Sequence, residues 1–332
     1  MFAKHSLLKA TLVGAVASIG LTQAALAADY SWDMPTPYAD AEFQTQNVRM
    51  FANDVKRLTD GQIDITVHSA NSLIANPEIK RAVQLQQVPI AELFISNLSR
   101  EDPIFEMDAI PFLASNYQDA LKLYQVTKPV MQERLLEQGL RLLYAVPWPS
   151  QAFYTTKPVN SVADLKGLKM RAYNEQTSRL AEALGTIPTT VQAPEIPQAF
   201  STGIIDTMFT SAQTGVTTKA WDYTKYYYDT QAWVPKNVVF INEKVYQELP
   251  DALKADLQEA AAIAETRGWM MSMASNIQKP IELAKNGMEV GVISPQFEKE
   301  LKAIGDQMLA AWLEKAGEDG QKIIEQYKAI SY

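Results

Sequence analysis

Residues 164–184 read DLKGLKMRAYNEQTSRLAEAL, and this stretch sets the expected fold of the chain. A Lys-Gly turn leads into residues 168–173, an apolar run typical of a short buried strand, and Asn174 then opens a helical pattern. A strand that runs directly into a helix is the repeating unit of α/β proteins. Arg171 stands out, because an arginine at the end of a buried strand needs an anionic partner.

The same alternation of strand and helix patterns continues outward on both sides. Strand patterns lie at residues 30–34, 63–67, 88–96, 140–146, 152–156, 189–192 and 238–241, with a strand-to-helix join at 203–209. Helical patterns lie at residues 43–58, 77–86, 175–184 and 194–201. This order predicts a mixed or parallel sheet covered by helices, in two α/β units. The chain should cross between the units near residues 145–155 and 230–240, which leaves a cleft suited to a small ligand.

The C-terminal part of the chain has helical patterns. The longest runs over residues 249–279, is rich in alanine and is interrupted only by Gly268, and we expect Pro280 to end it. A single helix of this length would span both units, although two stacked helices fit the pattern equally well. Residues 295–327 indicate one or two further helices.

The first 27 residues have the three parts of a secretory signal peptide. Lys4 and Lys9 give a basic start, residues 11–21 form an apolar core, and Ala-Leu-Ala predicts cleavage after Ala27. A membrane anchor is disfavoured because the apolar core is too short to span a bilayer. Without the two lysines the formal net charge of the chain goes from −8 to −10.

Composition excludes several kinds of chemistry. An acidic chain without basic blocks is a poor partner for nucleic acid, and a chain with no cysteine has no disulfide, thiolate nucleophile or zinc–sulfur site. Once the signal peptide is removed, His68 is the one histidine left, which excludes a multi-histidine metal site; we interpret it as a structural residue. We therefore expect no cofactor and no metal, and a cysteine-free exported protein suits a bacterial periplasm.

Four stretches, in collinear order, resemble the dicarboxylate-type solute-binding proteins of TRAP (tripartite ATP-independent periplasmic) transporters. They are ANPEIKRAVQLQQVPIAELFIS (75–96), DAIPFLASNYQDALKLY (108–124), SVADLKGLKMRAYNEQTSRLAEALG (161–185) and APEIPQAFSTGIIDTMFTS (193–211). The motif DLKGLK-x-R, followed by a G-x-x-D join, is specific in combination. The resemblance implies the two-domain periplasmic solute-binding fold, with a ligand cleft between the lobes and a long helix spanning both.

The resemblance also implies a domain division and a role. Domain I should comprise residues 28–150 plus about 237–275, and domain II residues 151–236 plus about 276–332 with the C-terminal helices. The protein would be a non-enzymatic, periplasmic and monomeric binding subunit. It would capture a small organic acid and deliver it to the TRAP membrane permease.

Arg171 is the first candidate for ligand binding. The family's signature arginine, which pairs with the ligand's carboxylate, corresponds to Arg171, and a guanidinium fork matches a carboxylate geometrically. The alternative is an ion pair with Glu175 or another local acid. Thr210 stands where the family has a ligand-binding asparagine, and a hydroxyl lacks the second function of an amide, so the ligand class stays open.

Further candidates come from segments next to the expected cleft. They are Trp148, Gln151, Phe153, Asn174 and Trp233 around the second domain, and Tyr38, Ser96 and Glu92 at strand ends of the first. Aromatic side chains there would provide apolar walls or a cation–π face, although Phe153 fits a core position equally well. Glu92 could pair with an amine if it faces the cleft; we favour its being a strand-end charge that faces solvent.

Two alternatives to the organic-acid receptor remain at this point. The same binding role could serve a small amine or a zwitterion, held by the aromatic residues and an acid such as Glu92. A protein of another class, a carboxylate-based hydrolase, is compatible with an acidic composition, but the sequence has no nucleophile–base pair at diagnostic spacing.

Overall fold

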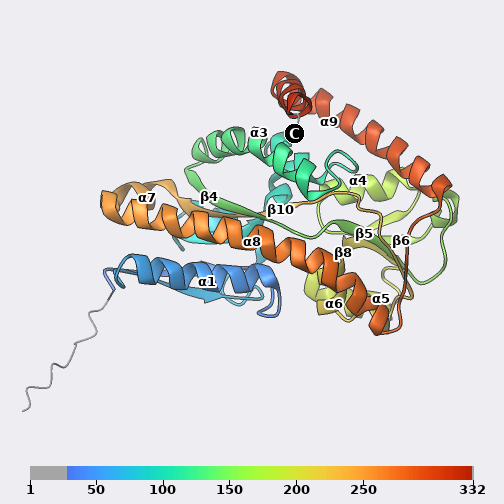
Figure 1. Ribbon diagram of the computed structural model, residues 1–332, viewed down its shortest axis with the longest axis horizontal. Helices are drawn as coiled ribbons and strands as arrows, with labels where there is room; N and C mark the ends of the chain where they lie inside the picture. Colours follow the sequence, from blue (N-terminus) through green and yellow to red (C-terminus); the bar gives the residue numbers. More distant parts are fainter. Residues whose placement is uncertain (1–27, 331–332) are drawn as a thin grey trace, which may run out of the picture.

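The computed structural model describes residues 28–330, so the predicted signal peptide lies outside the described residues. The strands are β1 (Tyr30–Pro35), β2 (Ile63–His68), β3 (Ile90–Phe94), β4 (Leu140–Pro147), β5 (Gln151–Thr155), β6 (Lys169–Ala172), β7 (Ile187–Thr190), β8 (Thr207–Ser211), β9 (Tyr226–Tyr228), β10 (Lys236–Asn242) and β11 (Glu289–Gly291). The helices are α1 (Phe43–Leu58), α2 (Ile79–Gln84), α3 (Tyr117–Leu136), α4 (Glu175–Ala183), α5 (Ile196–Ser201), α6 (Ala212–Thr217), α7 (Glu243–Glu248), α8 (Asp251–Lys285) and α9 (Pro295–Ala329). Figure 1 shows their arrangement.

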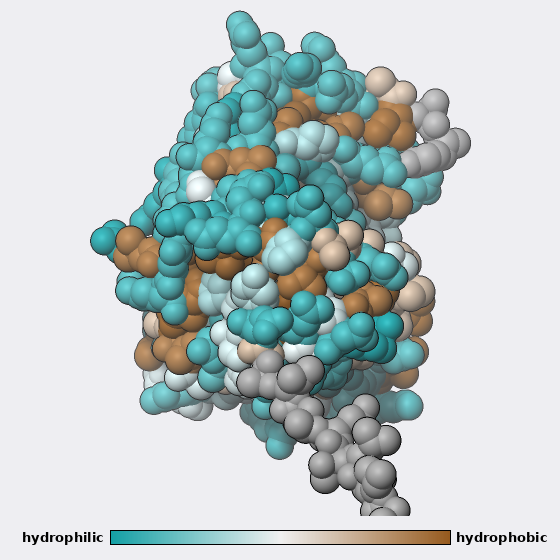
Figure 2. Space-filling model, turned by 90° about the vertical axis from the view of Figure 1, so that its left-hand side faces the viewer, coloured by the Kyte–Doolittle hydropathy of each residue, from teal (hydrophilic) through white to brown (hydrophobic). Residues whose placement is uncertain are grey.

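Two groups of strands divide the molecule into two lobes. Lobe 1 is built on the parallel pair β1–β2 and on the antiparallel sheet β3-β10-β4. Lobe 2 is built on the six-stranded sheet β11-β9-β5-β8-β6-β7. The strand–helix alternation and the mixed sheet predicted from the sequence are confirmed. The end of lobe 1 that carries α7 has a mainly hydrophilic surface with scattered apolar residues (Figure 2).

The stretch 164–184 folds as the sequence predicts. Strand β6 pairs in parallel with β7 and β8, so Arg171 lies opposite Thr189 on one side and Met208 on the other. Asn174 caps α4, because its side-chain oxygen accepts a hydrogen bond from the backbone N–H of Thr177 at 2.9 Å. The carboxyl ends of three parallel strands therefore meet at one edge of the lobe 2 sheet, which is where open α/β sheets bind ligands.

The chain crosses between the lobes twice in the region predicted, and the two crossings hydrogen-bond to each other. Trp148 donates from its backbone N–H to Pro235 at 2.7 Å, and Gln151 donates to Trp233 at 2.9 Å. The backbone N–H of Ala232 donates in return to Gln151 at 2.9 Å. These two crossings thus form a short two-stranded ribbon between the lobes.

Helix α8 runs along both lobes (Figure 1). It passes so close to β4 that a Cβ at Gly268 would lie 2.4 Å from Val146 Cγ2. The prediction that Pro280 ends this helix is wrong, because the helix continues to Lys285. A proline removes one backbone hydrogen bond, and the last turn is held instead by Leu283, which is fully buried in the core of lobe 2.

The remaining helical regions differ in how well the sequence predicts them. In α9, Gly317 has non-helical backbone angles (φ 59°, ψ −139°) and separates two helical stretches, which is one of the two expected outcomes. Helix α3 is not assigned from the sequence; it has Pro129 in its interior, and its buried residues, among them Leu123 and Met131, pack in the core of lobe 1. Within residues 28–330, no helix combines the length and apolar character needed to cross a bilayer.

Candidate functional site

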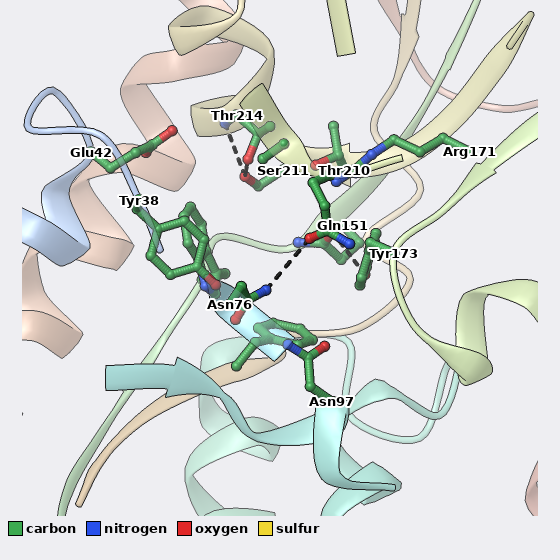
Figure 3. Close-up of a pocket in the computed structure, with 14 residues that line it drawn as sticks. Tyr38, Glu42, Asn76, Asn97, Gln151, Arg171, Tyr173, Thr210, Ser211 and Thr214 are labelled. Atoms are coloured by element: carbon green, nitrogen blue, oxygen red, sulfur yellow. Dashed lines mark hydrogen bonds between the residues drawn. The ribbon is translucent and has the colours of Figure 1, made fainter. Parts of the chain in front are cut away.

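A pocket with a volume of about 80 Å³ lies between the lobes, and Figure 3 shows the residues around it. Lobe 1 contributes Tyr38, Glu42, Asn76, Phe94 and Asn97; the crossing segment contributes Trp148; lobe 2 contributes Gln151, Arg171, Tyr173, Gln192, Ala193, Thr210, Ser211 and Thr214. The lobe 2 residues stand at or just after the carboxyl ends of β6, β7 and β8, apart from Gln151 at the start of β5. The pocket therefore lies where the sheet topology predicts a ligand site.

Arg171 faces this pocket without a carboxylate partner. Its side chain is 4% exposed, and its Nε donates a hydrogen bond to the backbone oxygen of Val191 at 3.0 Å. Its guanidinium carbon lies 4.9 Å from the centre of the Tyr173 ring. Within residues 28–330 the guanidinium forms no ion pair, and burial lowers the pKa of Arg171 to about 10.

The alternative partner considered for Arg171 is engaged elsewhere. One oxygen of Glu175 pairs with Arg100 at 2.7 Å and the other with Arg179 at 2.8 Å. An ion pair between Arg171 and Glu175 is therefore not present. The terminal nitrogens of Arg171 are left for an anion that enters the pocket, because a buried guanidinium without a counter-charge is costly.

Polar side chains of lobe 2 surround Arg171. The hydroxyl of Tyr173 donates to Gln151 Oε1 at 3.4 Å, and Gln151 Nε2 donates to the backbone oxygen of Pro149 at 3.0 Å. These contacts and the backbone hydrogen bonds of the crossing fix the Gln151 amide. Thr210 is 4% exposed, lines the pocket and forms no side-chain hydrogen bond with any residue in 28–330. Its hydroxyl is available to a ligand.

The opposite wall of the pocket is aromatic and is held in place from behind. Tyr38 and Trp148 pack edge to face, with ring centres 4.9 Å apart. The Tyr38 hydroxyl and the Trp148 indole N–H both donate to Asn237 Oδ1, at 3.1 and 2.9 Å. Because an indole nitrogen can only donate, the Asn237 oxygen must point toward the wall, and its amide nitrogen toward the interior.

Glu92 lies behind this wall and not in solvent. It accepts hydrogen bonds from Asn237 Nδ2 at 2.9 Å and from the Thr36 hydroxyl at 2.5 Å, and it is 1% exposed. The expectation that Glu92 faces solvent is therefore wrong, because β3 is buried along its whole length. Burial raises the pKa of the Glu92 carboxyl to about 7. Glu92 does not line the pocket, and it contacts the aromatic wall through Asn237.

Glu42 is the pocket residue that sequence reasoning missed most clearly. It precedes α1, where an acid is usually a favourable helix-terminal charge, but its side chain forms no cap. It is 6% exposed and lines the pocket, and its Oε2 has no hydrogen-bond partner within residues 28–330. Burial raises the pKa of this carboxyl. The amides Asn76, Asn97 and Gln192 were also missed, since polar loop residues carry no distinctive sequence signal.

The candidates from the sequence divide into two groups. The structure brings together Arg171, Thr210, Gln151, Trp148 and Tyr38 around the pocket. Phe153 and Trp233 lie instead in the core of lobe 2, where both pack against Phe209. Ser96 and Asn174 do not line the pocket either; they join the lobes beside it, with the Asn174 amide donating to the Ser96 hydroxyl at 2.7 Å.

The two lobes touch across the mouth of the pocket. Phe94 of lobe 1 packs edge to face against Tyr173 of lobe 2, with ring centres 5.7 Å apart. Asn76 donates to Gln192 at 3.5 Å, and Arg100 pairs with Glu175 at 2.7 Å. A ligand in this arrangement would be enclosed from both sides, which strengthens its electrostatic contacts by excluding water.

Comparison with known proteins points in the same direction as this geometry. The model of a family described as bacterial extracellular solute-binding protein, family 7, matches residues 36–316. Among solved structures, the chain is similar to DctP7, an extracytoplasmic solute receptor of Bordetella pertussis described as binding pyroglutamic acid. The identity is 48%, the TM-score is 0.88, and the match covers 90% of this chain and 99% of that one.

Two further relatives differ in their described ligands. A TRAP solute-binding protein from a marine metagenome, described as specific for pyroglutamate, is 40% identical with a TM-score of 0.89, and covers 91% of this chain and 100% of its own. The C4-dicarboxylate-binding periplasmic protein of Rhodobacter capsulatus is 24% identical over 264 residues, which is 76% of this chain and 77% of that protein.

Proposed function

Because this chain belongs to the bacterial extracellular solute-binding proteins of family 7, we propose that it is the receptor of a TRAP transporter for pyroglutamate. It binds this small carboxylate between its lobes and delivers it to the membrane permease. The family and the structural relatives are solute receptors, which supports a binding role over the alternative of a carboxylate-based hydrolase.

The unpaired guanidinium of Arg171 is the observation that carries this proposal. A ligand carboxylate would supply the counter-charge that residues 28–330 do not supply. The pocket volume of about 80 Å³ suits a compact ligand such as a single five-membered ring. Pyroglutamate is a five-membered lactam with one carboxylate, and it is the ligand described for the relatives at 48% and 40% identity.

We extend the proposal to location and assembly. The protein acts in the periplasm after cleavage of its signal peptide behind Ala27, and it acts as a monomer. Membership of an extracytoplasmic family supports the location. Mass spectrometry of the exported protein, together with its mass in solution, tests both the cleavage position and the monomer.

Thermal unfolding and calorimetry test the ligand. A ligand that binds only the folded state, present at 100 times its dissociation constant, stabilises the protein by about 2.7 kcal/mol. We expect pyroglutamate to raise the unfolding temperature and to bind with one site per chain, and to be recovered chemically unchanged. Glutamate, proline, succinate and small amines form the comparison set, which also tests the zwitterion alternative. If another member of the set binds and pyroglutamate does not, the ligand assignment is wrong; if none of the acids binds, the receptor role is wrong.

A further inference from the structure

Two opposite charges that form no ion pair within residues 28–330 line the same small pocket. The guanidinium of Arg171 comes from β6 of lobe 2, and the carboxylate of Glu42 comes from the start of α1 in lobe 1. Figure 3 shows them on opposite sides of the pocket. Arg171 explains why an anion binds, but it gives no reason for a buried carboxylate facing the same ligand. An uncompensated buried carboxylate is costly, so Glu42 calls for a hydrogen-bond donor.

The polar side chains nearest Glu42, which lower the pKa that burial raises, also have other partners. Gln213 and Thr217 of α6 hydrogen-bond to each other, with the Gln213 amide donating to the Thr217 hydroxyl at 3.2 Å. The Gln213 oxygen accepts from Ser275 at 2.8 Å. Lys279 of α8, whose charge also favours the ionised form of Glu42, pairs with Glu282 at 2.8 Å. Glu42 lines the pocket, and its Oε2 has no hydrogen-bond partner among residues 28–330.

We propose that Glu42 accepts a hydrogen bond from an N–H group of the ligand, and that it thereby selects a lactam over a ligand with oxygen at the same position. This inference rests on the proposed function and adds a second recognition point to it. Pyroglutamate carries its ring N–H next to the carbon that bears the carboxylate. With the carboxylate on Arg171, the ring N–H is the donor that the ligand can offer to Glu42.

The same carboxylate explains which acids the pocket should reject. A ligand with oxygen in place of the N–H would bring lone pairs against Glu42 and leave the buried carboxylate unpaired. A C4-dicarboxylate would bring a second negative charge toward it, and like charges at short range are strongly unfavourable. Specificity at Glu42 is thus largely a matter of excluding the wrong ligand.

A comparison of two ligands and two proteins tests the inference. The ligands are pyroglutamate and its lactone analogue, 5-oxotetrahydrofuran-2-carboxylate, in which ring oxygen replaces the N–H. The proteins are the wild type and Glu42→Gln, whose amide can either accept from N–H or donate to oxygen. Glu78→Gln is the matched control, because Glu78 is exposed on the same lobe and does not line the pocket.

Calorimetry should show that the wild type and the control prefer the lactam to the lactone by at least about tenfold, the effect of one hydrogen bond to a charged group. Glu42→Gln should reduce this preference at least fivefold. A wild type that binds both ligands with equal affinity overturns the inference and leaves the proposed function intact, and this comparison needs no variant. A preference that is unchanged in Glu42→Gln also overturns it. A wild type that binds neither ligand overturns the ligand assignment itself.

Discussion

Replacing Arg171 with methionine separates the binding role of this residue from its effect on folding. Methionine keeps an unbranched side chain of similar reach and removes the charge. In most proteins such a change at a buried arginine would break an ion pair and destabilise the fold. Here there is no ion pair to break, so we expect affinity and stability to change in opposite directions.

The expected loss of affinity follows from the geometry of a guanidinium and a carboxylate. A bidentate pair contains two hydrogen bonds between charged groups, and each contributes about 1.5–3 kcal/mol. Losing both costs about 3–6 kcal/mol, which corresponds to a fall in affinity of about 10²- to 10⁴-fold. Arg171→Lys keeps the charge without the fork and should weaken binding at least about tenfold.

The expected change in stability follows from burial. A pKa lowered to about 10 means that the charged form of Arg171 is disfavoured in the folded protein, and at one pKa unit per 1.36 kcal/mol the cost is about 3 kcal/mol at every pH well below 10. Methionine removes this cost. It also loses the hydrogen bond to Val191 and the contact with the Tyr173 ring, together about 1–2 kcal/mol. The ligand-free variant should therefore be more stable than the wild type by about 1–2 kcal/mol.

Calorimetry with pyroglutamate and denaturant unfolding without ligand measure the two quantities. The control is Arg57→Met, because Arg57 is largely exposed and pairs with Asp54 on the same helix, away from the pocket. We expect this control to keep its affinity within about threefold. Arg171 would not be the anion-binding residue if Arg171→Met bound pyroglutamate within threefold of the wild type. A ligand-free variant less stable by more than about 1 kcal/mol would refute the argument that the charge is unpaired.

Two further predictions concern groups away from the ligand. The folded protein keeps a proton on Glu92 up to a pH of about 7, whereas the unfolded chain releases it near 4.5, so this residue should lower stability as pH rises through that range, by up to about 3 kcal/mol. Denaturant unfolding at pH 5 and pH 8 should show this loss in the wild type and a smaller loss in Glu92→Gln; identical pH dependence in both proteins would contradict the assignment. Gly268→Ala should destabilise the protein by about 1–3 kcal/mol, because the new Cβ would lie 2.4 Å from Val146 Cγ2, and this outweighs the gain of about 1 kcal/mol from replacing a helical glycine. Gly291→Ala, where a Cβ meets nothing within 4 Å, is the control, and equal unfolding midpoints for the two variants would show that α8 can shift away from β4.

The parts of the fold that the sequence predicts are those governed by local rules. The segment around Arg171 is predictable because a turn, an apolar run and a capping asparagine follow one another along the chain. The end of α8 is not, because burial of Leu283 outweighs the hydrogen bond lost at Pro280. Tertiary packing decides such positions, and it leaves no signature in the neighbouring residues.

The same distinction applies to the pocket. Trp148 and Gln151 could be placed near the ligand because they stand where the chain crosses between lobes. That Glu92 is buried and Glu42 lines the pocket could not be predicted, because an acid within a strand or before a helix gives no sign of what packs against it. Which carboxylate faces the pocket depends on whether Asn237 stands in front of it, and that is settled by strands far apart in the sequence.

The hydrogen-bonded ribbon between the lobes also limits how the molecule can move. Trp148 hydrogen-bonds to Pro235, and Gln151 to Trp233. These bonds hinder the two segments from twisting or sliding past each other, but they allow both segments to bend together. Opening of the lobes should then follow a single hinge-like path. Trp148 and Gln151 lie on this flexure, while Glu42 and Arg171 lie on the parts that swing apart. The ligand therefore contacts the hinge through Trp148 and Gln151, and the two moving lobes through Glu42 and Arg171. Only a molecule that binds both lobes at the same time can stabilise the closed state.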